Sequence, residues 1–394
     1  MARQVLTLNQ ISLKGLERLP RDCYEIASEF SHPDAILLRS HKLKAEDIAD
    51  SVLAIARAGA GVNNIPVEEC SKRGIAVFNS PGANANAVKE LVAVGLLLGS
   101  RGVVEGIQYV DTLAGMTDKA QMNKTLEAQK KMFKGSELEG KTLGVVGLGA
   151  IGSMVAEMAL TLGMDVVGYD PALSVDAAWR LSSQVRKADT LSALFARCDY
   201  ITLHLPVLDS TRGLINAELF SVLREGTCLL NFARQEIVDE EALVAALNGD
   251  RLRKYIADFP SPALIGREDV ILMPHIGAST DEAEDNCAIM AANQLKEFLE
   301  NGNIRNSVNF PNLVLERVSG CRLSVTNENV PKILGSILSI LADENINVID
   351  MLNKSRDGIA YNLIDVEGHT PDTVLDQMRA LDGVVNVRMI GDCA

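Results

Sequence analysis

The sequence lacks any long hydrophobic run. No stretch reaches the roughly eighteen uncharged apolar residues that a membrane-spanning helix needs, so we expect no transmembrane segment. The first residues, Met1 to Val5, lead into a short apolar segment and then polar residues. They lack the long apolar core and the small-residue cleavage site of a signal peptide. We therefore expect a cytoplasmic protein.

Cysteine pairs and an excess of positive charge are also missing. The seven cysteines are scattered and no CxxC pair occurs, which favours buried reduced thiols over disulfides or a metal site. The net charge of −14 argues against nucleic acid or an anionic membrane as a partner. An anionic substrate would have to be bound by a local cluster of basic residues.

What the sequence does contain is a regular alternation of short apolar runs and helix-length segments. From residue 1 to about 93 this alternation predicts a parallel sheet with helices, and Asn86 to Leu98 predicts a buried or interface helix. From Lys141 onward a clearer series of strands and helices predicts a doubly wound domain. A chain of 394 residues is long enough for two or three domains.

The last part of the chain has a different pattern. A break at Asn309–Asn312 predicts a linker. The order strand, helix, strand, strand, helix, strand from Arg322 to Ile390 then predicts a ferredoxin-like fold. Pro331 and Pro371 are expected at the first position of the two helices, where the missing N–H of proline has no helical partner to lose.

A glycine-rich motif, Gly147-Leu148-Gly149-Ala150-Ile151-Gly152, lies between a predicted strand and a predicted helix. Gly147 allows a tight turn, Gly149 lets the backbone approach a pyrophosphate, and Gly152 permits close packing of helix and strand. Asp170 ends the next strand, where its carboxylate can accept hydrogen bonds from ribose hydroxyls and would repel a 2′-phosphate. The motif therefore indicates an NAD site; a glycine-rich turn without a ligand is the alternative.

Four segments are similar to the D-2-hydroxyacid dehydrogenase family. They are Arg57–Ile65 with Asn79-Ser80-Pro81 and Asn84, the glycine-rich motif, His204-Leu205-Pro206 with Asn231–Arg234 and Val238-Asp239, and Pro274–Thr280. The resemblance implies a discontinuous, flavodoxin-like α/β substrate-binding domain of residues 1–93 and 276–310. An NAD-binding Rossmann domain of residues 94–275 would be inserted in it. Residues 319–394 resemble an ACT regulatory domain.

The resemblance also implies roles for individual residues. His275 would be the general base, because imidazole titrates near neutral pH, and Arg234 would orient the substrate carboxylate with its planar fork. The cofactor-binding residues would be Gly147, Gly149, Ala150, Ile151, Gly152, Asp170, His204, Pro206, Ala233, Asp258 and Gly277. The substrate-binding residues would be Arg39, Arg57, Gly59 and Asn84, with Lys130 or Lys131 as further cations unless these form a solvated basic face.

The combination with an ACT domain resembles the branch of the family that oxidises D-3-phosphoglycerate to 3-phosphohydroxypyruvate, the first step of serine biosynthesis. We therefore expect NAD as the hydride acceptor, a phosphorylated hydroxyacid as substrate, and a homodimer or homotetramer. Two alternatives would share the fold. One is a dehydrogenase for another acid, such as 2-hydroxyglutarate, glycerate or hydroxypyruvate, and the other is a non-catalytic NAD-sensing protein.

The sequence departs from the family at three sites, and at the first of them Gln235 replaces the usual glycine after Arg234. The glutamate that usually pairs with the catalytic histidine is absent from the segment Asp258–Ala263, and Asp258, Glu268 and Glu282 are the nearby acids that could replace it. In the tail, a set of asparagines resembles the site for an amino-acid effector: Asn327, Asn329 and Asn347. However, Lys332 follows Pro331 where that site has a glycine.

Overall fold

The computed structural model describes residues 2–318 and 320–391 and divides into two compact units. Unit 1 comprises Met1–Asn84 and Thr280–Ala394, and unit 2 comprises Ala85–Ser279. Position 319 and Cys393, which belong to the predicted ACT domain, lie outside the described residues. None of the helices in the described ranges has the length and hydrophobicity of a transmembrane span.

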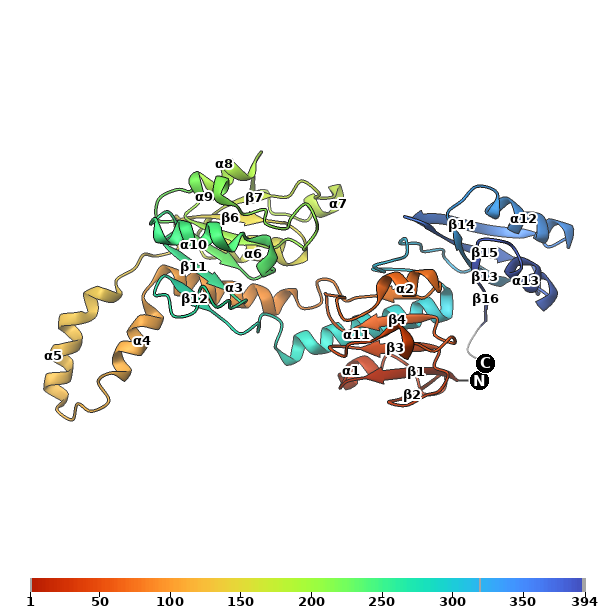
Figure 1. Ribbon diagram of the computed structural model, residues 1–394, viewed down its shortest axis with the longest axis horizontal. Coiled ribbons are helices and arrows are strands. Elements are labelled where there is room, and N and C mark those ends of the chain that lie inside the picture. The colour runs from red at the N-terminus through yellow and green to blue at the C-terminus, as the bar shows by residue number, and fades with distance from the viewer. Residues whose placement is uncertain (1, 319, 392–394) are drawn as a thin grey trace. The chain divides into compact units, whose positions relative to one another are not determined.

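Unit 1 begins with a five-stranded parallel sheet of order β2-β1-β3-β4-β5, drawn in red to orange in Figure 1. This order is the flavodoxin-like one, which confirms the predicted fold class. Every residue of β3 is buried, as in a strand that is covered on both faces. The elements are β1 (Arg3–Leu8), α1 (Leu13–Leu16), β2 (Tyr24–Ala27), β3 (Ala35–Leu38), η1 (Ala45–Asp47), β4 (Ala54–Arg57), α2 (Val67–Lys72) and β5 (Ala76–Phe78).

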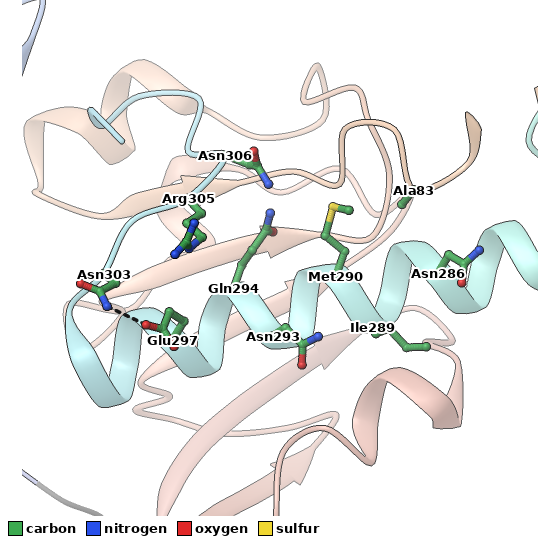
Figure 2. A pocket seen from close by; sticks show the side chains of 10 residues that line it. All are labelled: Ala83, Asn286, Ile289, Met290, Asn293, Gln294, Glu297, Asn303, Arg305 and Asn306. Atoms are coloured by element: carbon green, nitrogen blue, oxygen red, sulfur yellow. Dashed lines mark hydrogen bonds between the residues drawn. The ribbon is translucent and has the colours of Figure 1, made fainter. Parts of the chain in front are cut away.

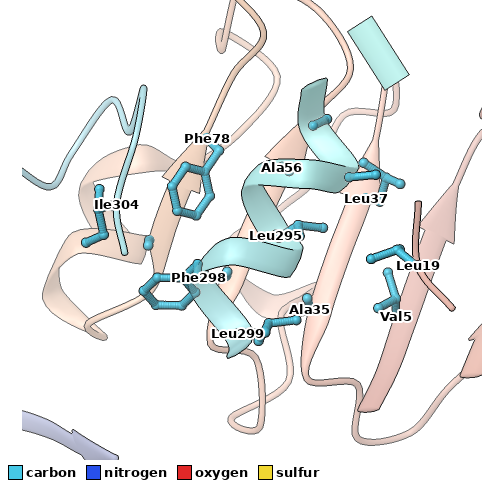
Figure 3. Close-up of a cluster of buried hydrophobic side chains, with 14 of the residues drawn as sticks. Val5, Leu19, Ala35, Leu37, Ala56, Phe78, Leu295, Phe298, Leu299 and Ile304 are labelled. Carbon is cyan, nitrogen blue, oxygen red and sulfur yellow. The ribbon is translucent and has the colours of Figure 1, made fainter. Parts of the chain in front are cut away.

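The core of this sheet depends on a helix that is distant in sequence, α11 (Asp281–Asn301). The Thr280 side chain accepts a hydrogen bond from the Ala283 N–H and caps its start, and Gly302, at φ 71°, ends it in a left-handed conformation. Figure 3 shows Leu295 and Phe298 of α11 among strand residues such as Phe78. The buried face of α11 therefore completes the fold of unit 1.

Unit 2 contains a seven-stranded parallel sheet of order β12-β11-β10-β9-β6-β7-β8. Neighbouring residues of β6 point to opposite faces: Val145 belongs to one buried cluster and Val146 to another. Both faces are therefore covered, as expected for a doubly wound sheet, and the strand order reverses between β6 and β9. The strands are β6 (Thr142–Val146), β7 (Asp165–Tyr169), β8 (Arg186–Lys187), β9 (Tyr200–Leu203), β10 (Cys228–Asn231), β11 (Lys254–Ala257) and β12 (Val270–Leu272).

The helices of unit 2 include the one predicted from its apolar pattern, α3 (Ala85–Ser100). The next two helices form an arm that projects from the rest of the unit in Figure 1 and contains no buried residue. The arm consists of α4 (Val103–Asp111) and α5 (Lys119–Gln129). The remaining helices are η2 (Lys130–Phe133), α6 (Ala150–Thr161), α7 (Val175–Ala178), α8 (Leu191–Phe195), α9 (Ala217–Ser221), η3 (Gln235–Ile237) and α10 (Glu240–Asn248).

The end of the chain forms a four-stranded antiparallel sheet of order β14-β15-β13-β16, which confirms the ferredoxin-like prediction. Its elements are β13 (Cys321–Glu328), α12 (Ile333–Asp343), β14 (Val348–Arg356), β15 (Ile359–Val366), α13 (Asp372–Arg379) and β16 (Val384–Ile390). The predicted proline positions were wrong. Pro371 is the N-cap of α13, and Pro331 precedes the N-cap of α12. That N-cap is Lys332, which has a φ of 80° that favours glycine.

Arg322 fastens this sheet to the rest of unit 1. Its guanidinium pairs with Asp365 at 2.6 Å, and the two side chains are 0% and 2% exposed. The remaining N–H groups donate to the carbonyl oxygens of Asn301, Leu315 and Glu316 at 3.0–3.1 Å. A buried ion pair is stable only when its other hydrogen-bonding groups are satisfied, and here they are satisfied by the end of α11 and by the segment after it.

We predict that Arg322→Met alone destabilises β13 and β15 by about 3–5 kcal/mol, because Asp365 is left buried without its cation. The double variant Arg322→Met/Asp365→Leu should recover part of this loss, since it removes both charges. Hydrogen exchange of the β13 and β15 amides measures the local opening free energy in a chain that does not unfold in one step. If the free-energy losses of the two single substitutions add up to the loss in the double variant, Arg322 and Asp365 are not energetically coupled.

Candidate active site

In unit 2, several of the predicted cofactor residues lie directly after the end of a strand. Gly147 follows β6, Asp170 follows β7 and His204 follows β9. Asp258 follows β11, and the loops after β10 and β12 carry Arg234 and His275. Because all seven strands are parallel, these residues share the carboxyl edge of one sheet, where open α/β sheets bind their ligands.

The glycine-rich loop leaves room where a dinucleotide needs it. Gly147 has a φ of 89°, and a side chain there would meet the carbonyl oxygen of His204. A side chain on Gly152 would overlap the carbonyl oxygen of Gly147, so the start of α6 can approach β6 only with glycine at this position. Space beside Gly149 is open, which allows a pyrophosphate to reach the backbone N–H groups at the start of α6, where Ala150 and Ile151 lie.

Asp170 holds the loop and faces the same edge. One carboxylate oxygen accepts the N–H of Leu148 at 2.9 Å, and the other accepts the N–H of Ala172 at 2.9 Å. Each oxygen keeps a further lone pair that can accept a hydrogen bond from a ribose hydroxyl. The residues present therefore fit NAD, with a negative charge at the position that a 2′-phosphate would approach.

His204 is a neutral group at this edge. Its Nε2 lies 3.0 Å from the Thr202 hydroxyl, and its buried Nδ1 has no hydrogen-bond partner among the described residues. Burial lowers the pKa of His204 to about 3, so the ring carries no charge near neutral pH. The next loop residues include Pro206, which is exposed and whose carbonyl oxygen accepts the Thr211 hydroxyl at 2.6 Å.

Asn231, at the end of β10, shapes the loop that carries Arg234. Its amide donates to the Arg234 carbonyl at 2.9 Å and to the Tyr255 hydroxyl, and it accepts the Ala233 N–H at 3.2 Å. The Arg234 guanidinium donates to the carbonyl oxygen of Ala233 at 2.7 Å. In the sequence Asn231 is only part of a motif, but in the structure its buried amide fixes the backbone at Ala233 and Arg234.

Asp258 holds the backbone beside His275. Its two carboxylate oxygens accept the N–H groups of Ile276 at 2.8 Å and Gly277 at 2.6 Å, and the side chain is buried. His275 itself has a φ of 59°, a conformation that needs such support in a residue with a side chain. This contact could not be predicted from local sequence patterns, because it joins residues eighteen and nineteen positions apart.

The histidine ring packs against an aromatic ring. The centroids of His275 and Phe259 are 5.0 Å apart, and the imidazole makes no hydrogen bond to any described residue. Of the acids considered as replacements for the family's glutamate, Asp258 is engaged with backbone N–H groups. Glu268 precedes β12 whereas His275 follows it, so these two lie at opposite ends of that strand.

In unit 1, Arg39 directly follows β3, and Arg57 is the last residue of β4. The two strands are neighbours, and Leu38 pairs with Arg57. The Arg57 side chain donates to the carbonyl oxygens of Arg39 and Gly61, within the loop that contains Gly59. Arg39 pairs with Glu284 of α11 at 2.6 Å. The structure thus brings both arginines to one carboxyl edge, where a carboxylate already neutralises one of them.

The other candidates lie in separate places. The buried Oδ1 of Asn84 has no partner among the described residues. Lys130 and Lys131 are exposed in η2, and Lys130 pairs with Glu127, as in a solvated basic face. Asn327 is buried at the end of β13 with its amide bonded to Asn362, and Asn329 follows it.

Asn347 is exposed and precedes β14, and its carbonyl accepts the N–H of Glu367 beyond the far end of β15. The register between β13 and β15 pairs Asn327 with Ala360 at one end of these strands and Cys321 with Val366 at the other. Asn327 and Asn347 are therefore at opposite ends of the sheet, and one copy of the chain does not bring the three asparagines together.

Comparison with known proteins identifies the family. A model of the NAD-binding domain of D-isomer-specific 2-hydroxyacid dehydrogenases matches residues 109–277. The chain is 34% identical over 366 residues to the D-3-phosphoglycerate dehydrogenase of Haemophilus influenzae, covering 89% of this chain and 85% of that protein. It is 32% identical over 371 residues to the enzyme of that name from Escherichia coli, covering 90% and 86%.

Solved structures agree with this assignment. NAD⁺-bound 3-phosphoglycerate dehydrogenase of Entamoeba histolytica matches with a TM-score of 0.61 and 28% identity, over 79% of this chain and 100% of that chain. D-Mandelate dehydrogenase of Rhodotorula graminis, at 23% identity and a TM-score of 0.66, covers 81% of this chain and 100% of its own and shows the same fold. The chain belongs to the D-isomer-specific 2-hydroxyacid dehydrogenase family. It is an NAD-dependent dehydrogenase.

We predict that Asp170→Ala weakens NAD binding by roughly 1.5–3 kcal/mol, the worth of hydrogen bonds to a charged acceptor, and weakens NADP binding less. Asp170→Asn is the matched control, because it keeps an acceptor for the Leu148 N–H and removes the charge. Calorimetric titration of both nucleotides into the three proteins measures the differences. Equal losses for NAD and NADP would mean that Asp170 acts only on the loop.

Proposed function

We propose that the chain oxidises D-3-phosphoglycerate to 3-phosphohydroxypyruvate with NAD as the hydride acceptor, the first step of serine biosynthesis. The observation that carries this proposal is the pair of arginines, Arg39 and Arg57, at the carboxyl edge of β3 and β4. A phosphate requires such cations in a chain with a net charge of −14. The names of the relatives support the same substrate.

In the proposed reaction, His275 accepts the hydroxyl proton of the substrate as the carbinol carbon becomes a carbonyl. Arg234 binds the substrate carboxylate and polarises the forming carbonyl oxygen. Bound NAD supplies the acceptor for the hydride that leaves the same carbon. Asp258 positions His275 through the backbone of Ile276 and Gly277. His204 is uncharged and therefore does not repel the positively charged nicotinamide of NAD⁺.

We predict that His275→Ala nearly abolishes kcat, because the proton then has no acceptor. Asp258→Asn should lower kcat at least tenfold, since an amide cannot accept both N–H groups and the loop at His275 loosens. In the Asp258→Asn variant the KM for the phosphorylated substrate should stay close to that of the parent, whereas a general loss of structure would change both constants. Normal turnover in His275→Ala would overturn the mechanism.

The phosphate assignment has its own test. Arg39→Ala should raise the KM for D-3-phosphoglycerate far more than the KM for D-glycerate, because only D-3-phosphoglycerate has a phosphate that Arg39 can bind. Glu284→Gln should act in the opposite direction, since it frees the Arg39 guanidinium from its ion pair. Steady-state kinetics with both substrates measures this. If Arg39→Ala harms both substrates alike, Arg39 binds the carboxylate or is structural.

The assembly and its control are parts of the same proposal. We propose a cytoplasmic homodimer or homotetramer, supported by exposed apolar side chains on α3 and the arm, such as Leu97, Ile107 and Val110. We also propose that residues 1–93 and 276–310 bind the substrate, that residues 94–275 bind NAD, and that the ACT segment, residues 319–394, takes an amino-acid effector. Because Asn327 and Asn347 lie at opposite ends of one sheet, such an effector site would need a second copy of the chain.

A further inference from the structure

A cavity with both polar and apolar walls lies along α11 in unit 1, and neither Arg39 nor Arg57 lines it. Its volume is about 680 Å³, within the range of roughly 300–1,000 Å³ that is usual for small-molecule sites. Figure 2 shows its walls: one face of α11, the segment at Arg305 and Asn306, and the turn at Ala83. No role assigned above to NAD or to the substrate uses these residues.

The lining of this cavity combines polar side chains with the apolar side chains of Ile289 and Met290. The opposite face of α11 buries Ala291, Leu295 and Phe298 in the core. The cavity face presents amides and one carboxylate at helical spacing: Asn286, Asn293, Gln294 and Glu297. This face can therefore offer hydrogen bonds to a small polar molecule.

Gln294 is the strongest sign of a ligand. It is 7% exposed, and neither its amide oxygen nor its amide nitrogen has a hydrogen-bond partner among the described residues. In Figure 2 its amide extends into the cavity beside Arg305, Asn306 and Met290. Buried amides are nearly always satisfied, so this one calls for a molecule that supplies both an acceptor and a donor.

The charged side chains of the lining indicate which hydrogen-bond acceptor the bound molecule carries. Glu297 is already engaged, because its oxygens accept the amides of Asn303 at 2.6 Å and Asn301 at 3.2 Å. Arg305 is exposed and makes no ion pair or hydrogen bond to a described residue. Its planar guanidinium is thus available to a carboxylate, for which its geometry is suited. The remaining amides can accept from a hydroxyl or an ammonium group.

We propose that this cavity binds a small carboxylate that carries a hydroxyl or amino group on the neighbouring carbon. Arg305 holds the carboxylate, and Gln294 bonds both to it and to the second group. The site is also placed to influence turnover. Ala83 directly precedes Asn84, where the chain leaves unit 1, and Asn286 lies in the second turn of α11, just after the chain returns at Thr280. A ligand that joins these walls braces both connecting segments.

The experiment uses the full-length protein and two isosteric probes, L-alanine and L-lactate, which differ only in an ammonium or a hydroxyl group. Acetate, which lacks the second group, and inorganic phosphate complete the set. Isothermal titration measures affinity, and hydrogen exchange reports where binding protects the backbone. We expect saturable binding of at least one isostere, more tightly than acetate, with protection of the segment from Asn286 to Asn306.

Arg305→Ala should weaken this binding at least tenfold, and Gln294→Leu should weaken it as well. Arg18→Ala is the matched control, since it removes one exposed positive charge from the same unit and should change nothing. Preference for L-alanine or for L-lactate identifies the second group as ammonium or hydroxyl. The proposal is overturned if neither isostere binds, if only phosphate binds, or if Arg305→Ala binds the probes as tightly as the parent. These readouts are independent of catalysis and of its substrate.

Discussion

The parallel direction of the strands in both open sheets is the constraint on which the proposed site residues depend. When every strand of a sheet runs the same way, all the loops that follow them emerge at one edge. In unit 2 this edge collects the glycine-rich loop, Asp170, His204, Arg234, Asp258 and His275 from six different strands. In unit 1 it collects Arg39 and Arg57. Strand direction thus places the proposed site residues at shared edges before any side-chain contact is considered.

Backbone contacts then give these loops a fixed shape, and buried polar side chains make most of them. Asp170 binds the glycine-rich loop, Asn231 binds the loop of Arg234, and Asp258 binds the loop of His275. Each of these side chains trades hydration for two or more backbone partners, which is favourable only when all partners are in place. In the same way Arg322 ties the antiparallel sheet to the end of α11.

Much of this could be predicted from the sequence, because it is local. The glycine-rich motif, the alternation of strands and helices and the order of the last six elements are all patterns of neighbouring residues. What sequence could not reveal depends on contacts between distant residues, such as Arg322 with Asp365, Asp258 with Gly277, and Arg39 with Glu284. The predicted start at Pro331 was two residues early, because Lys332 has a φ of 80° that is not helical. The predicted start at Pro371 was one residue early, because Pro371 is the N-cap with an extended backbone.

The account rests on one central claim, that the chain transfers a hydride from a phosphorylated D-hydroxyacid to NAD. The most direct test follows the appearance of NADH when the purified full-length chain is given NAD with D-3-phosphoglycerate, D-2-hydroxyglutarate or D-glycerate in separate reactions. The account predicts a kcat/KM for D-3-phosphoglycerate that exceeds the other two by at least tenfold, the contribution of about one charge-assisted contact to its phosphate. An equal or higher value for an unphosphorylated acid would contradict the assigned substrate, and no NADH from any of them would contradict the claim itself.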